Sequence, residues 1–295
     1  MDGPSEAAAT PSSRQAAAGQ RVVIYRHRLP VRVMHWINVL CMAILLMSGL
    51  GIFNAHPALY WGKDSGFASP WLAIKAEQKP GGALAGKTQI GDRQWETTGV
   101  LGLSKVDGEA TSRAFPSWAT VPGPQWLSMS RRWHFFFAWL FVINGIAYVL
   151  YTIFSRHLTR DLVPTLAELR AIGASIKDHL LLKHPSGEAA RRYNVLQNLS
   201  YLIVVFGLLP LVVLAGLAMS PRIDTVFTGW VDWLGGRQSA RSLHFLAAGG
   251  LLLFTLIHVF EVIINGVWNE IRSMLTGWYR LPPEPKTDRR QQVSR

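Results

Sequence analysis

Four long apolar runs alternate with polar connections along the chain. The runs cover residues 33–53, 133–154, 199–219 and 243–264. Each has the roughly 20 apolar residues that a helix needs to cross a bilayer. The pattern therefore predicts an all-α integral membrane protein, a four-helix bundle whose even number of spans places both termini on one side.

The three connections differ in length and character. Residues 54–131 form the longest one and are rich in Gly, Pro, Thr and aromatic side chains, which predicts an irregular but ordered cap with a short hairpin. A connection of this length is usually functional. In the second connection, apolar residues recur every three or four positions, which predicts an amphipathic helix on the membrane surface; they are Leu166, Leu169, Ile172, Ile176 and Leu180.

The two ends of the chain lack this apolar pattern. Residues 1–20 are rich in Ala, Ser, Pro and Gly without an apolar core, so we expect a disordered tail and a first helix that is retained rather than cleaved as a signal. Residues 276–295 read as a C-terminal tail, which leaves 21–275 as the membrane domain. Of the 30 Lys and Arg residues, 18 lie before the first apolar run, in the second connection and after the fourth run. This distribution predicts cytoplasmic termini and places the long connection, 54–131, on the opposite side.

Composition narrows the function classes. Hydrophobic residues make up 49% of the 295 and charged residues only 16%, which is unusual for a soluble domain. The net charge of +12 comes from Lys and Arg between the apolar runs, without the basic and aromatic patch of a nucleic-acid-binding surface. The single cysteine, Cys41, excludes an internal disulfide, a covalent Cys-x-x-Cys-His haem attachment and a cysteine-ligated cluster.

Two histidines in the fourth run suggest a cofactor. His244 and His258 are 14 residues apart, so both leave the same helix face about 21 Å apart along the axis. His134 starts the second run and has the depth of His244, whereas His35 starts the first run and has the depth of His258. Four histidines thus form two predicted pairs at two depths, as two bis-imidazole haems would require.

Other interpretations of these residues stay open. Any one histidine alone is better explained by the membrane interface or by a hydrogen bond in the core, but intramembrane ionisable groups are rare and usually functional. Zinc would leave each pair of histidines short of a tetrahedral ligand set.

Other residues in or beside the spans also have two interpretations. Glu261 is either a proton acceptor or an interfacial carboxylate. Several arginines flank the proposed haem ends and either pair with propionates or extend to the interface: Arg28, Arg32, Arg131, Arg132 and Arg241. Seven span glycines make room for a macrocycle or only for a neighbouring helix: Gly49, Gly51, Gly145, Gly207, Gly216, Gly249 and Gly250.

The chain resembles the bacterial four-helix di-haem cytochromes b that anchor nickel-iron hydrogenases, formate dehydrogenase and thiosulfate reductase. The resemblance rests on RHRLPVRVMHWINVLCMAILLMSGL, RRWHFFFAWLFVINGIAYVLY, RRYNVLQNLSYLIVVFGLLPLVVLAGLAMSP and GGRQSARSLHFLAAGGLLLFTLIHVFEV. It implies two haem b groups, one held by His35 and His258 and the other by His134 and His244. It also implies a quinone site, with Asn194 and Gln197 of the RRYNVLQ element as contacts, although amides that cap a helix start explain these two residues equally well.

The long connection is more similar to the thiosulfate-reductase-like group, through NAHPALYWG and RAFPSWATVPGP. The resemblance then implies a bacterial inner-membrane subunit of a respiratory chain. It would carry electrons between the quinone pool and a periplasmic redox partner, with a molybdopterin oxidoreductase as the expected partner. Substrate chemistry would belong to that partner. The alternatives are a haem-free scaffold or proton or metal transporter, and a standalone quinone-linked oxidoreductase acting on a small oxidant.

Overall fold

The computed structural model describes residues 22–66, 69–123, 125–155, 164–181, 195–227 and 229–281. The predicted N-terminal tail lies outside these ranges. Tertiary contacts divide the chain into two units. The larger unit comprises residues 33–163 and 198–260, and the smaller unit comprises residues 1–32, 164–197 and 261–295. Each unit is described by itself below.

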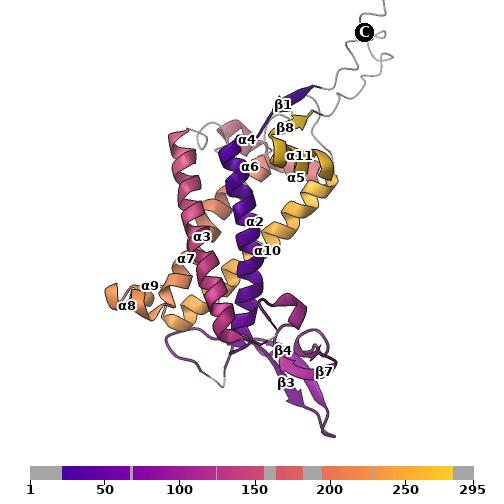
Figure 1. The fold of residues 1–295 in the computed structure, drawn as a ribbon, viewed down its shortest axis with the longest axis vertical. Helices are drawn as coiled ribbons and strands as arrows, with labels where there is room; N and C mark the ends of the chain where they lie inside the picture. Colours follow the sequence, from indigo (N-terminus) through magenta and orange to yellow (C-terminus); the bar gives the residue numbers. More distant parts are fainter. Residues whose placement is uncertain are drawn as a thin grey trace, which may run out of the picture. The chain divides into compact units, whose positions relative to one another are not determined.

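Four helical segments are long and apolar enough to cross a membrane, which confirms the four predicted spans. They are α2 (Leu29–Phe53), α3 (Leu127–Phe154), the third span Val195–Ala218, and α10 (Arg237–Ile264). Each begins four to six residues before its apolar run. The extra turns carry Arg, Ser and Gln, because the backbone hydrogen bonds of a helix continue past the point where apolar side chains end. Figure 1 shows these helices running along one another in the larger unit.

The third span is not a uniform α-helix. It consists of α6 (Val195–Ile203), a π-helical turn η4 (Val204–Leu208) and α7 (Leu209–Ala218). Pro210 stands at the start of α7. Proline lacks the N–H that would close an α-helical bond, and its ring crowds the carbonyl four residues earlier. The chain therefore widens into a π turn just before it.

A buried amide joins the first two spans. Asn144 of α3 is 6% exposed, and its Nδ2 donates hydrogen bonds to the carbonyl of Met34 at 2.9 Å and to Oδ1 of Asn38 at 2.7 Å, both on α2. A hydrogen bond between membrane helices fixes the register of one helix against the other, because a slip would leave polar atoms unpaired in an apolar interior. Asn144 thus sets the depth of α3 relative to α2.

We expect Asn144→Leu to lower the free energy of unfolding by about 1–2 kcal/mol, the value of an interhelical hydrogen bond in a membrane protein. Thermal unfolding of the purified protein in detergent would measure this change. The double variant Asn38→Leu with Asn144→Leu is the control. It should recover part of the loss, because it leaves no buried amide without its partner. A double variant less stable than Asn144→Leu would contradict this role.

The long connection folds into strands, so the protein is not all-α. The cap contains the hairpin pairing that the sequence predicts, but it forms two sheets and is not an irregular segment. One antiparallel sheet has the order β2 (Ala58–Leu59), β3 (Leu72–Gln78), β4 (Leu84–Ile90) and β5 (Arg93–Glu96). A second pairs β6 (Gly102–Val106) with β7 (Glu109–Arg113), and a short 3₁₀ turn, η1 (Ser117–Ala119), follows. Figure 1 shows β3, β4 and β7 beside the end of α2 and the start of α3.

The small size of the buried side chains explains why the hydrophobic pattern of the sequence does not indicate these strands. Strands β3 and β4 bury Ala73, Ala85 and Thr88 as well as larger residues, and buried positions follow one another along each strand, so the alternation of apolar and polar positions is weak. The two sheets also touch at their backbones. A Cβ at Gly102, which has a φ of 80°, would lie 2.6 Å from the carbonyl oxygen of Lys75, so only glycine fits that crossing.

The core of this strand region continues into the helix bundle. Its buried residues are Phe53, Leu59, Leu72, Ile74 and Ala114, with Trp71, Leu101, Phe115 and Phe245 packed against them. Phe53 ends α2, and Phe245 lies on α10 directly after His244. Their rings are 5.0 Å apart. The strand region is therefore packed onto the helix ends by apolar contacts and is not a separate flexible insertion.

A short helical connection joins the third span to α10. It contains α8 (Pro221–Val226) and α9 (Trp230–Trp233). Ala218, Val231 and Ala240 form a small buried cluster between this connection and the adjoining helices. On the other side, Val226, Phe227 and Trp233 are 63–89% exposed. Exposed aromatic and aliphatic side chains beside the ends of two spans are typical of the membrane interface.

The smaller unit contains the remaining helices and one strand pair. In the second connection, α4 (Leu166–Arg170) and α5 (Ile172–Leu180) form where the amphipathic helix is predicted. Thr165 and Glu168 form a capping box at the start of α4. Leu166, Leu169 and Ile176 are exposed, as a membrane-facing stripe would be, and the surface placement stays a prediction.

The unit also holds α11 (Val267–Thr276) and an antiparallel pair of β1 (Val23–Tyr25) with β8 (Trp278–Arg280). Strand β8 falls inside the segment 276–295 that the sequence assigns to a tail.

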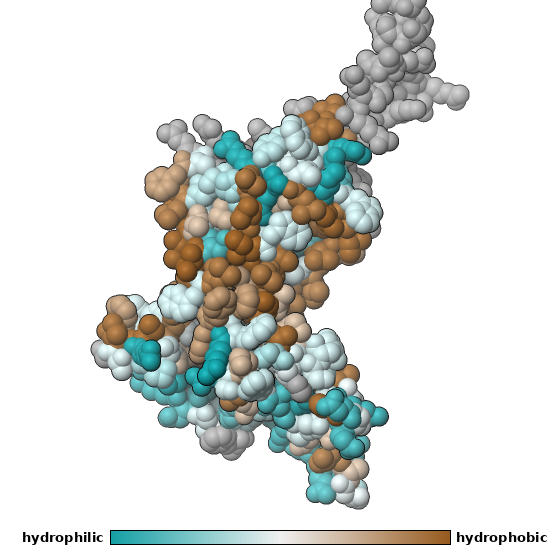
Figure 2. All heavy atoms as spheres, in the orientation of Figure 1, coloured by the Kyte–Doolittle hydropathy of each residue, from teal (hydrophilic) through white to brown (hydrophobic). Residues whose placement is uncertain are grey.

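In the larger unit, the hydropathy of the surface differs between the helices and the strand region. Figure 2 shows hydrophobic side chains along the helices and hydrophilic side chains over the strands. Large apolar side chains exposed on the spans include Phe136, Ile143, Ile203 and Leu253. An exposed apolar surface of this extent is unsuited to water and suits a lipid environment.

Candidate functional site

The structure brings the four span histidines together as two pairs within the larger unit. The rings of His134 (α3) and His244 (α10) have centroids 6.1 Å apart, and those of His35 (α2) and His258 (α10) have centroids 6.3 Å apart. The first pair lies at the helix ends that lead to the strands and is called the sheet-side pair. The second lies near the start of α2 and the end of α10 and is called the terminal-side pair.

A backbone carbonyl orients His244. The Nδ1 atom of its ring lies 2.8 Å from the carbonyl oxygen of Val212 on α7. Because a carbonyl oxygen only accepts, Nδ1 must carry the proton, and Nε2 then has a free lone pair. A metal-ligating histidine is usually held in this way, with the second ring nitrogen donating to a carbonyl or carboxylate.

A serine orients His134 in the same sense. Ser48 of α2 is fully buried, and its Oγ lies 3.0 Å from Nδ1 of His134. The Ser48 hydroxyl donates its own proton to the carbonyl of Leu45 at 3.3 Å, so Oγ is left to accept from the imidazole. In the neutral form of either histidine of the sheet-side pair, Nδ1 therefore carries the proton and Nε2 is unprotonated.

Two of the seven span glycines make room for the sheet-side rings. A Cβ at Gly49 would lie 3.4 Å from Cε1 of His134, and a Cβ at Gly216 would lie 3.2 Å from Cε1 and Nδ1 of His244. The other five differ: Gly51 faces Ser130, Gly250 faces Leu208, and Gly145, Gly207 and Gly249 have no heavy atom within 4 Å of an added Cβ. Packing against a histidine, rather than glycine content in general, therefore distinguishes Gly49 and Gly216.

Aromatic packing surrounds the terminal-side pair. The ring of Phe254 stacks on His258 one helical turn later, with centroids 6.0 Å apart, and Tyr201 packs edge-on against Phe254. The Nδ1 atom of His35 is buried and has no hydrogen-bond partner among the described residues. A buried polar atom of this kind requires a partner that the described residues do not supply.

The other residues that the sequence predicts for the site do not belong to either histidine pair. Asn194 lies outside the described residues. Gln197 is on α6 in the smaller unit and is partly buried. Glu261 accepts a hydrogen bond from Asn265 at 3.1 Å, so its carboxylate is engaged locally. Arg131 lies over the ring of Phe135, 5.7 Å from its centroid.

The first turns of α10 bind an extended segment that follows α2. The carbonyls of His56, Ala58, Tyr60 and Gly62 all face α10. Arg241 donates to the first two, Ser242 donates to Tyr60 at 2.6 Å, and the backbone N–H groups of residues 238 and 239 donate to Gly62. Burial and the charge of Arg241 lower the pKa of His56 below its ordinary value. This hydrogen-bonded strap fixes the helix that carries His244.

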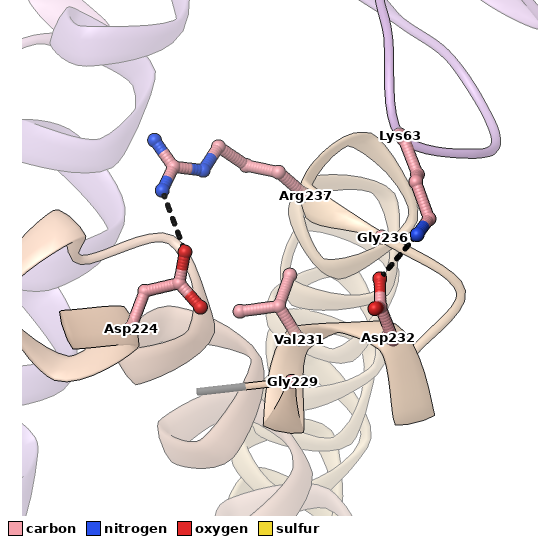
Figure 3. A pocket seen from close by; sticks show the side chains of 7 residues that line it. All are labelled: Lys63, Asp224, Gly229, Val231, Asp232, Gly236 and Arg237. Carbon is pink, nitrogen blue, oxygen red and sulfur yellow. Dashed lines mark ion pairs between the residues drawn. The ribbon is translucent and has the colours of Figure 1, made fainter. Parts of the chain in front are cut away.

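A pocket of about 370 Å³ lies at the start of α10, and charged side chains but no histidine are among the residues that line it. Figure 3 shows the two ion pairs at its rim, Lys63 with Asp232 at 2.9 Å and Arg237 with Asp224 at 3.6 Å. The hydrogen bond from Lys63 to Asp232 raises the pKa of the lysine. Because Lys63 and Arg237 each have a carboxylate partner, we interpret the pocket as a place where ion pairs join neighbouring segments and not as a binding site.

Comparison with known proteins gives the family. The model of the prokaryotic cytochrome b561 family matches residues 26–277, which include all four spans and all four histidines. The chain belongs to this family. Prokaryotic cytochromes b561 are membrane haem proteins, so the haem b and the electron transport expected from the sequence follow from membership.

The chain is also 27% identical over 234 residues to a putative protein-methionine-sulfoxide reductase subunit YedZ1 of Azospira oryzae, which covers 79% of this chain and 88% of that protein. No solved structure matches the chain. The comparisons leave the narrower thiosulfate-reductase-like group untested, and it stays a prediction.

Both histidine pairs have a spacing at which two imidazoles could hold one metal ion, such as the iron of a haem. A metal–imidazole bond is about 2 Å long and the ring centroid lies about 1 Å behind the nitrogen, so two imidazoles bound to one ion would have centroids up to about 6 Å apart. The observed separations of 6.1 and 6.3 Å match this distance. No group of three or more His, Cys, Asp or Glu suited to a metal ion occurs in the described ranges. The pairs therefore fit a cofactor that needs two protein ligands.

Sequence reasoning overlooked the residues that orient these ligands. Ser48 could have been noticed, because a serine inside an apolar span needs a partner. Asn38 and Asn144 carry the same signal. The carbonyl of Val212 gives no sequence signal, since every residue has a carbonyl.

Proposed function

We propose that this chain is a di-haem cytochrome b subunit of the bacterial inner membrane that carries electrons between the quinone pool and a periplasmic redox partner. The observation that supports this best is the meeting of four histidines as two pairs near opposite ends of one helix, α10. Both termini would be cytoplasmic and the strand region periplasmic, as the distribution of Lys and Arg predicts.

In this proposal His134 and His244 would hold one haem b, and His35 and His258 the other. Haem supplies reversible one-electron chemistry when bound. The protein contributes the rest: Ser48 and the Val212 carbonyl hold the sheet-side imidazoles in the ligating tautomer. The apolar spans exclude water from both sites. Two ligand sites on one rigid helix fix the distance that an electron must cover.

The partner would dock on the periplasmic side, where the strand region lies close to the sheet-side pair. The relative from Azospira oryzae is named as a reductase subunit, which supports a subunit role rather than an independent enzyme for this chain. We propose a molybdopterin oxidoreductase as the partner, as the resemblance of the long connection to the thiosulfate-reductase-like cytochromes implies.

A redox difference spectrum with haem quantification on the purified protein tests the central claim. Two haems b per chain are expected, reduced by dithionite and by a quinol. A colourless protein, or one haem per chain, would contradict the proposal, and a colourless protein would favour a haem-free scaffold or transporter.

We propose that quinol binds near the start of the third span, with Asn194 and Gln197 as contacts. Gln197→Leu should leave the haem content unchanged and slow haem reduction by quinol roughly tenfold, the effect of losing one hydrogen bond of about 1.4 kcal/mol. Stopped-flow absorbance would measure the rate. Gln125→Leu, the same change at an exposed site in the long connection, is the control and should not slow it. Equal rates for the two variants would remove Gln197 from the quinol site.

A further inference from the structure

Arg241 is a partly buried cation whose hydrogen bonds go to backbone carbonyls. Its Nη1 donates to the carbonyl of Ala58 at 3.0 Å, and its Nη2 donates to that of His56. Across the part of the chain that the structure describes, no carboxylate lies within ion-pair distance of it. Carbonyl dipoles solvate a guanidinium but do not cancel its charge. No described carboxylate therefore compensates the full positive charge at this end of α10.

The guanidinium of Arg241 is held in a fixed position by its surroundings. The neighbouring Ser242 donates to the carbonyl of Tyr60, and Ser239 accepts from the N–H of Gly62 at 2.8 Å. The guanidinium also lies over the ring of Phe53, 5.7 Å from its centroid. A side chain tied by two carbonyls and packed on an aromatic ring cannot swing into water, as a snorkelling arginine would. Arg241 is therefore part of the fixed framework of the strap.

The charge of Arg241 lies close enough to His244 along α10 to influence a haem bound there. Residues three apart on a helix are neighbours, with Cβ atoms about 5–6 Å apart, so Arg241 lies one turn from a ligand of the sheet-side pair. Reduction of a haem adds one electron and lowers its charge by one unit. A nearby cation favours the reduced form, and partial burial weakens the screening of that effect.

We propose that Arg241 raises the reduction potential of the haem held by His134 and His244, acting as a fixed positive charge and a positioning residue. This inference rests on the proposed di-haem function.

A redox titration of the full-length protein, followed by absorbance, tests the proposal. In Arg241→Gln, the ratio of reduced to oxidised sheet-side haem at a fixed applied potential should fall about tenfold, equivalent to about 59 mV for a one-electron couple. The terminal-side haem should not change. Repeating the titration with His258→Ala present isolates the sheet-side haem. Arg132→Gln is the matched control, because Arg132 is exposed and lies two residues before His134. Its shift should be less than a third as large, since water screens an exposed charge.

Arg241→Lys separates charge from geometry. It keeps the positive charge, so the ratio should stay within twofold of wild type even if hydrogen bonding to the strap weakens. If Arg241→Gln loses haem and cannot be titrated, Arg241→Lys tests the proposal by itself. A tenfold fall in the ratio of reduced to oxidised sheet-side haem in Arg241→Lys would overturn the proposal. Equal shifts in Arg241→Gln and Arg132→Gln would overturn it as well, while two haems per chain would leave the proposed function intact. Wild-type protein without a sheet-side haem would overturn both.

Discussion

Replacing His244 with alanine should reduce the haem content from two groups per chain to about one. The remaining haem would be the terminal-side one, because the two histidines proposed to hold it, His35 and His258, are untouched. His134→Ala should give the same single-haem protein, since a bis-histidine site fails when either ligand is lost. His35→Ala and His258→Ala should instead remove the other haem. Haem quantification and electron paramagnetic resonance of the oxidised protein would distinguish the two single-haem forms.

His56→Ala is the control for these four variants. His56 is close to the sheet-side end of α10, and its carbonyl accepts from Arg241, but its side chain is not in either pair. The variant should keep both haems, because the backbone carbonyl is unchanged. A different grouping of the four ligand variants, for example His134→Ala behaving like His258→Ala, would show that the pairs are assigned wrongly.

Gly216→Leu should remove most of the sheet-side haem without touching a ligand. A Cβ at this position already lies 3.2 Å from the ring of His244, so the larger side chain must displace the imidazole. The ring would then lose its hydrogen bond to the Val212 carbonyl and its alignment with His134. We expect a fall of more than half in sheet-side haem, with the terminal-side haem retained. The same haem assay measures both.

Gly207→Leu is the matched control, with the same substitution in the same span. Gly207 is exposed, and nothing lies within 4 Å of its added Cβ, so the new side chain has room. Haem content should equal that of wild type. If Gly216→Leu also keeps both haems, the close approach of Gly216 to His244 has no role in the site.

The number of spans and the pairing of the histidines could be read from the sequence because both depend on local periodicity. A run of about 20 apolar residues predicts a spanning helix in any context. The 14-residue interval between His244 and His258 places both on one face of a helix regardless of the rest of the fold. With the direction of each span known, the depths of His35 and His134 follow.

The strands of residues 54–131 could not be predicted in this way. Their buried positions hold alanine, glycine and threonine, such as Ala85, Gly86 and Thr88, so the alternation that reveals a strand is faint. Their stability comes from pairing between strands distant in sequence and from the backbone crossing at Gly102. These long-range contacts have no local pattern.

The sequence alone determined a four-span membrane protein, its family resemblance and the two histidine pairs, since these follow from hydrophobic length and helical geometry. Only the tertiary structure decided how the ligands are held. Ser48 and the Val212 carbonyl set the tautomers of His134 and His244, and the strap of carbonyls from His56 to Gly62 fixes Arg241 beside them. Such contacts join residues up to 185 positions apart, and all of them except the one between Ser48 and His134 involve backbone atoms, which are the same in every residue. Only folding brings these groups within hydrogen-bond distance.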